Sequence, residues 1–95
     1  MVADPLLIQK EAVAELSFPG AEVLTMPKQI NARREALLRA TRLGNILRNK
    51  VKIIFEDSLA IRMVETTIWA TTERNISLKG GIIIPIHRIH RVKIL

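Results

Sequence analysis

The chain contains no cysteine and no tyrosine, and its only aromatic residues are Phe18, Phe55 and Trp69. Without cysteine, neither a disulfide nor a thiolate zinc site can stabilise the fold. The same absence is typical of a reducing compartment, and we expect a cytoplasmic protein. The 95 residues are 48% hydrophobic, a composition that predicts a folded chain with one core. We therefore expect a single domain spanning residues 1–95.

Long apolar runs are also missing from the sequence. No run approaches the ~18 residues that a membrane-spanning helix needs. Residues 1–16 lack the basic start of a signal peptide and carry Asp4, Glu11 and Glu15 among their apolar residues. We expect neither a membrane partner nor a cleaved signal peptide.

Acidic residues are scarce beyond the first quarter of the chain. Residues 1–27 carry one base and four acids, a net charge of −3, whereas residues 28–95 carry fourteen bases and five acids, a net charge of +9. The densest basic stretch is 28–54, where eight bases accompany a single acid, Glu35. Such a stretch can contact the phosphates of RNA or another polyanion, although it can equally be the solvated face of a helix and a strand. The candidate contacts are Arg33, Arg34, Arg39, Arg42, Lys50 and Lys52.

The first 48 residues predict a helical cap segment. Asp4-Pro5 is typical of a helix start, and the broad apolar stripe that follows predicts a helix over 5–16. Pro19-Gly20 ends this segment, and residues 21–26 predict a short extended piece closed by Pro27.

Residues 31–43 allow two interpretations. Their propensities favour a helix, with Asn31 as its cap and Gly44 as the left-handed residue after its end. The same residues also alternate in a way that a strand over 36–42 would permit. We favour the helix.

From Asn49 onward the hydrophobic period changes to two, which predicts a β-barrel segment over 49–95 with four to five antiparallel strands. We expect strands over 50–56, 61–72 with a bend near its middle, 76–79 and 82–86. Gly80-Gly81 predicts a tight turn, and the three-residue apolar spacing after Ile86 predicts a 3-10 turn before a last short strand. The expected core residues are Val51, Ile53, Phe55, Val64, Ile68, Ile76, Leu78, Ile84 and Ile89.

The strand order and the closing segment Ile84-Pro85-Ile86-His87-Arg88-Ile89-His90-Arg91-Val92 resemble the small Sm-like and SH3-like barrels, in particular the Rho-binding antiterminator type. The run from Lys50 to Val92 is also similar to short bacterial proteins of no assigned function. The resemblance implies an α+β fold in which an N-terminal helix, or two, precedes a four- to five-stranded barrel. The resemblance to the Rho-binding antiterminator type also implies an acidic surface that binds a partner protein. The uridine-binding motif of Sm proteins is not visible, so the resemblance transfers no RNA-contact residues.

Neither histidine nor serine marks a catalytic site. His87 and His90 lie three residues apart, but no clustered carboxylate near them in the sequence could complete a metal site. No serine stands in a nucleophile motif. We expect no enzymatic activity, no cofactor and no metal. Trp69 is either a second core residue or an exposed anchor for a partner.

Two functions remain open. The first is a non-enzymatic binding module that contacts RNA or another polyanion through the basic segment. The second is a protein-interaction or self-assembly module that uses an exposed strand edge. A helix over 5–16 resting on its own barrel would give a monomer, whereas an uncovered edge at 82–84 would pair with a second copy. We expect a homodimer.

Overall fold

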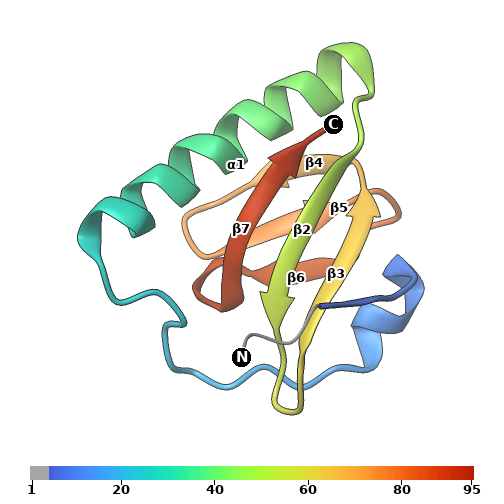
Figure 1. The fold of residues 1–95 in the computed structure, drawn as a ribbon. Coiled ribbons are helices and arrows are strands. Elements are labelled where there is room, and N and C mark those ends of the chain that lie inside the picture. Colours follow the sequence, from blue (N-terminus) through green and yellow to red (C-terminus); the bar gives the residue numbers. More distant parts are fainter. Residues whose placement is uncertain (1–4) are drawn as a thin grey trace.

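One long helix and two small β-sheets make up the part of the chain that the computed structural model describes, residues 5–95 (Figure 1). The expected cap Asp4 lies outside the described residues. In chain order the elements are β1 (Leu6–Leu7), the 3-10 helix η1 (Lys10–Glu15), α1 (Pro27–Leu47), β2 (Val51–Glu56), β3 (Ile61–Thr66), β4 (Ile68–Thr71), β5 (Asn75–Leu78), β6 (Ile83–Pro85), the 3-10 helix η2 (Ile86–Arg88) and β7 (Ile89–Ile94). None of the helices in this part of the chain combines the length and the apolar character needed to cross a membrane.

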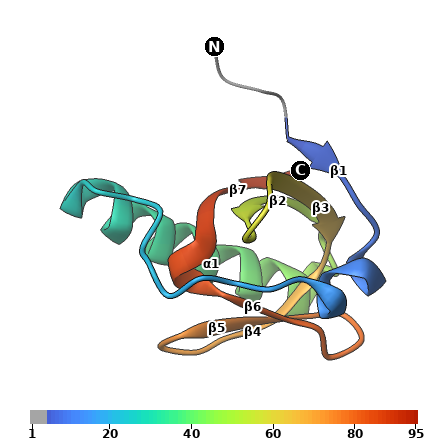
Figure 2. The same ribbon diagram turned by 90° about the horizontal axis from the view of Figure 1, so that it is seen from below.

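The strands form two sheets, with strand orders β1-β3-β2-β7 and β4-β5-β6. Every pair is antiparallel except β1–β3, which is parallel. The long strand expected over 61–72 is interrupted at Thr67, so β3 lies in the first sheet and β4 in the second. Figure 2 shows the two sheets as two layers. The expected bend is confirmed, and it is the point at which the chain passes from one layer to the other.

The expectation of a four- to five-stranded barrel is wrong for the described residues, in which six strands follow α1 and the strands form two open sheets. Neither sheet closes on itself, because β6 pairs only with β5, and β7 pairs only with β2. The chain passes from β6 to β7 through η2, and these two strands do not pair with each other to join the two sheets. Helix α1 packs against both β4 and β7, and η1 packs against β3 and β6. Helical segments therefore cover the openings that a barrel would have closed with strand pairs.

The expected N-terminal helix over 5–16 is also wrong. Leu6 and Leu7 pair with Arg62 and Met63 of β3, which holds this stretch extended before the short η1 begins. Local propensity favours a helix here, but a free edge of β3 offers backbone partners to an extended segment. Val13 of η1 is 1% exposed and belongs to the core, so the segment still contributes an apolar anchor.

The main helix lies in the middle of the chain and is longer than expected. Residues 31–43 are helical, as we favoured, but α1 begins at Pro27, because proline is suited to a first helical position whose N–H has no helical partner. Gly44 lies within the helix, and the left-handed residue after its end is Arg48, with φ of 56°. Residues 21–26 form no strand.

The alternation of apolar residues in the strands predicts the core residues correctly. All nine expected core residues are at most 1% exposed, and Leu37 and Ala40 of α1 complete the contact between helix and sheets. Gly80 and Gly81 have φ of 92° and 84°, which confirms the turn between β5 and β6. The 3-10 turn before the last strand is confirmed as η2.

Candidate polyanion-binding groove

The six basic residues expected to form one surface lie in five different environments. Arg33 is only 6% exposed and points into the protein. Its guanidinium forms an ion pair with Glu22 and donates a 2.9 Å hydrogen bond to the carbonyl oxygen of Ile89. The hydrogen bond from Arg33 is the largest influence on Glu22 and holds the pKa of that carboxyl below its ordinary value. Arg33 thus fastens α1 to β7 and is not part of the outer surface.

The other three arginines of α1 do not converge either. Arg34 donates to the carbonyl oxygens of Thr72 and Glu73, at 3.1 and 3.4 Å, and so joins the helix to the β4–β5 turn. The buried positions of α1 recur at 33, 37, 40 and 44, on one face of the helix. Arg39 and Arg42 are exposed and lie on the opposite side, directed away from the sheets.

A groove of about 660 Å³ lies where α1 ends and β3 bends into β4. Five segments line it: residues 7–10, the last turn of α1 with Arg48, Lys50 just before β2, residues 65–67 and 69 around the bend, and Lys79 of the β5–β6 turn. The close approach of α1 to the bend fixes its floor, because Gly44 has no side chain to hold the helix and the bend apart. The groove is therefore a product of the fold and not of one sequence segment.

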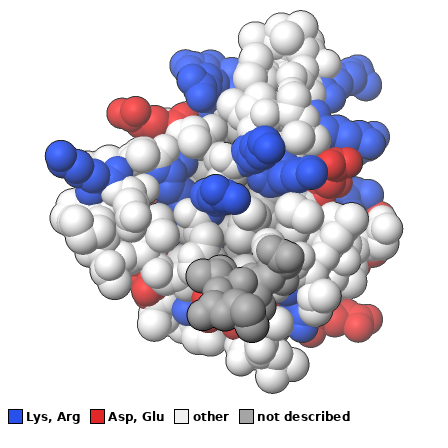
Figure 3. All heavy atoms as spheres, viewed as in Figure 1, with Lys and Arg blue, Asp and Glu red and all other residues white. Residues whose placement is uncertain are grey.

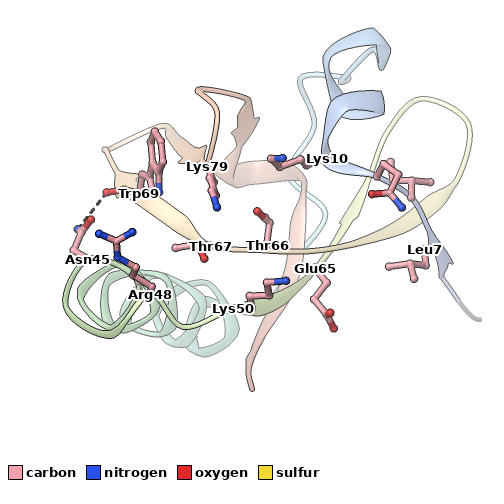
Figure 4. A pocket seen from close by; sticks show the side chains of 13 residues that line it. Leu7, Lys10, Asn45, Arg48, Lys50, Glu65, Thr66, Thr67, Trp69 and Lys79 are labelled. Atoms are coloured by element: carbon pink, nitrogen blue, oxygen red, sulfur yellow. Dashed lines mark hydrogen bonds between the residues drawn. The ribbon is translucent and has the colours of Figure 1, made fainter.

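Four basic side chains point into this groove from different segments (Figure 4). Lys50 is the one member of the sequence-derived site among them; the others are Lys10, Arg48 and Lys79. Lys10 forms a 2.7 Å ion pair with the exposed Glu11. Within residues 5–95, none of the ion pairs involves Arg48, Lys50 or Lys79. Three cations thus line one hollow, and none of them forms an ion pair with a described carboxylate.

Trp69 stands at one end of the groove, beside Arg48 and Lys79 (Figure 4). The residue is 49% exposed, so the alternative of a second core residue is wrong. The amide of Asn45 donates a 3.2 Å hydrogen bond to the backbone carbonyl of Trp69, which ties the strand to the end of α1. The indole is therefore presented from a fixed backbone position in a cationic setting.

The wall between these residues is polar. Thr66 and Thr67 are 5% and 7% exposed and line the groove at the bend, with Glu65 beside them. Glu65 is the one carboxylate among the described lining residues. In the strand register it lies opposite Lys52, on the outer face of the first sheet. One acid against four bases leaves the groove positive.

The outer face of the first sheet continues the positive charge. Lys52 pairs in register with Lys93, and Ile54 pairs with Arg91, so three basic side chains alternate with the inward-facing residues of β2 and β7. Figure 3 shows a band of Lys and Arg side chains across this face. Lys50, directly before β2 and two residues before Lys52, links this face to the groove.

The two histidines have structural partners. The Nε2–H of His87 donates to the carbonyl oxygen of Pro19 at 2.9 Å, and that of His90 donates to a carboxylate oxygen of Glu56 at 2.8 Å. In the part of the chain that the structure describes, no three histidine or acidic side chains come together as metal ligands.

The sequence identified the basic character of this region but not the residues that meet in it. Arg48 belongs to the basic stretch 28–54. Lys10 lies 38 positions before Arg48 along the chain, and Lys79 lies 31 positions after Arg48. The pairing of β1 with β3 and the backbone hydrogen bond from the N–H of Lys79 to the carbonyl oxygen of Thr67 place them around the same groove. Comparisons with protein-family models, with curated proteins and with solved structures returned no significant match, so the groove is interpreted from its own residues.

Proposed function

We propose that the protein is a non-enzymatic binding module that holds RNA or a related polyanion in the groove at the end of α1. The observation that carries the proposal is the convergence of Arg48, Lys50 and Lys79, none of which has a carboxylate partner among the described residues. Gathering like charges raises the free energy of the folded state, and a bound phosphate chain removes that cost.

The contrast with the paired arginines supports this assignment. Arg33, Arg62 and Arg88 each have an acidic partner and side chains at most 19% exposed, so their charges stabilise the fold. The groove cations come from separate segments and point to one place. Cations that serve only solubility are typically dispersed over a surface among acids, whereas these are concentrated in a hollow.

The chemical character of the groove suits binding rather than catalysis. Its lining offers positive charge, the threonine pair at the bend and one indole, with Glu65 as the single carboxylate among the described lining residues. General acid–base work depends on titratable groups held at hydrogen-bond distance from a reacting atom and tuned near the working pH. A cationic, hydroxyl-lined hollow instead binds phosphates through charge and hydrogen bonds.

We further propose that the kinship with small Sm-like and SH3-like folds holds at the level of element order. After Met26 the chain runs through one helix, a strand, a bent strand, a hairpin and a 3-10 turn before its last strand. This order supports the resemblance, while the open sheets are a departure from it.

The test of the proposed function is the salt dependence of RNA binding. Four groove cations give an expected slope of about −3 in a plot of log affinity against log salt for a single strand, or a loss of about 50-fold between 50 and 200 mM salt. Lys79→Glu should weaken binding and flatten the slope. The matched control is Arg74→Glu, an exposed arginine on the opposite hairpin turn of the same sheet, which should leave both nearly unchanged. Equal effects of the two reversals would place the contact elsewhere.

A second candidate function is self-assembly through β6. Ile83 is 56% exposed on this edge strand, although η1 packs against the same strand. An exposed apolar side chain on an unpaired edge favours pairing with another copy. Polyanion binding and self-assembly use different parts of the molecule, so one does not exclude the other.

A further inference from the structure

We infer that the groove takes a single-stranded nucleic acid and that one of its unpaired bases stacks on Trp69. This inference rests on the proposed function, because it specifies which polyanion the cations hold. The groove combines two kinds of recognition that a nucleotide also combines, a set of cations for phosphate and an exposed aromatic face for a base.

The exposure of Trp69 is the first step. An indole buries more apolar area than most side chains, and a protein of this size gains stability from every large side chain it buries. Here the preceding residue, Ile68, is fully buried while Trp69 is 49% exposed. Arg48 and Lys79 lie beside the indole (Figure 4). A polyanion without bases would contact those cations through its phosphates and leave the indole without a partner. A nucleotide contacts the cations through its phosphate and stacks its base on the indole.

The shape of the site selects an unpaired base. Trp69 lines a hollow bounded by the end of α1 and the β5–β6 turn, and it does not stand on an open flat surface. A base in a duplex has its faces covered by its neighbours and cannot enter the hollow without being extruded. A single strand can turn one base onto the indole at little cost, so single strands should bind more tightly than duplexes.

The extent of the positive surface favours a strand over a free nucleotide. From Lys50 the charge continues to Lys52, Lys93 and Arg91 on the outer face of the first sheet. Alternate residues of a strand are separated by about 7 Å. The basic path is thus longer than one nucleotide, and a chain of phosphates can follow it from the groove across β2.

The intrinsic fluorescence of the full chain reports on this site directly, because Trp69 is its one tryptophan. We would titrate three probes, each compared at the same phosphate concentration: a 12-nucleotide single-stranded RNA, a duplex of the same sequence, and inorganic polyphosphate. Quenching would be followed in the wild type, and the affinities of the wild type, Trp69→Ala and Trp69→Phe would be compared by isothermal titration calorimetry, which needs no tryptophan. The single strand is expected to quench the emission and to lose about 5- to 150-fold in affinity with Trp69→Ala. Trp69→Phe keeps an aromatic face and should retain most of the affinity.

The outcomes separate this inference from the proposed function. Polyphosphate should bind the wild type and Trp69→Ala equally, and circular dichroism would show that the variant is folded. If polyphosphate binds but the affinity for single-stranded RNA is the same in Trp69→Ala, the base contact is wrong and polyanion binding stands. Equal affinity for duplex and single strand also overturns the inference. If none of the polyanions binds, the proposed function fails with it.

Discussion

Gly44 of α1 lies directly against the carbonyl oxygen of Ile68: a Cβ atom on this glycine would be 2.6 Å from that oxygen and 2.9 Å from a methyl carbon of Thr67. The helix and the β3–β4 bend can approach this closely only because residue 44 has no side chain. The same contact sets the floor of the groove, whose lining includes Gly44 and Thr67.

Gly44→Ala should therefore destabilise the protein by about 1–3 kcal/mol, although alanine favours a helix more than glycine does. The added methyl group would clash with a backbone carbonyl, which cannot move aside as a flexible side chain can. Urea denaturation would measure the loss. Gly20→Ala is the matched control, since nothing lies within 4 Å of its added methyl group, and it should be neutral or slightly stabilising. Equal stability of the two variants would contradict the close packing.

Ile53 tests the core that the alternation of β2 predicts. Its side chain is fully buried between the sheets, and Ile53→Ala should reduce the free energy of unfolding by about 2–4 kcal/mol through lost burial and a cavity. Ile54→Ala, on the outer face of the same strand, should cost clearly less. If the two variants lose the same stability, the assignment of the inner face is in error.

Asp57 makes the folded state sensitive to acid. Burial is the largest influence on its pKa and raises it, but hydrogen bonds from the N–H groups of Ala60 and Leu59 and from Arg62 together outweigh burial. The pKa of Asp57 therefore lies below its ordinary value of 3.8. A carboxyl whose pKa is lower in the folded state than in the unfolded state stabilises the folded state at pH values above its unfolded-state pKa. This stabilisation is lost as the pH falls through the folded-state pKa.

We accordingly expect the free energy of unfolding to decline as the pH falls below about 4. Asp57→Asn should make this decline smaller. It should also lower the free energy of unfolding at neutral pH by about 1–3 kcal/mol. Denaturation curves from pH 7 to pH 2 would show both effects. A variant with the wild-type slope would mean that Asp57 does not contribute to acid unfolding.

The β6 edge gives a prediction about assembly. Ile83 is exposed on this strand, and pairing with a second copy about a two-fold axis would cover it. We expect light scattering at micromolar concentration to give twice the chain mass of 10.7 kDa, and Ile83→Lys to return the monomer mass. A wild-type monomer that the substitution does not affect would rule out a dimer through this edge.

Where the sequence predicted the fold, the information was local. In β2 every second residue is buried, so Val51, Ile53 and Phe55 identify the inner face without knowledge of any partner strand. Turns were equally local, because Gly80 and Gly81 supply the positive φ that the β5–β6 connection needs.

Where the sequence failed, the deciding contact was distant. Leu6 and Leu7 are extended because they pair with β3, more than fifty residues away, and not because of their neighbours. Gly44 was interpreted as a helix end, but its use is the contact with Ile68. The groove has the same origin: charge density along the chain indicated Lys50, but only the fold brings Lys79 to it.

The most direct test of the central claim is a map of the RNA-binding surface by nuclear magnetic resonance. Amide shifts of the ¹⁵N-labelled protein would be followed during titration with a short single-stranded RNA at low salt. The groove account predicts saturable shifts at Lys50, Thr67 and Lys79 and at the indole N–H of Trp69, which fade as salt is added. Shifts confined to the outward face of α1 around Arg39 and Arg42, or no shifts at millimolar RNA, would contradict it.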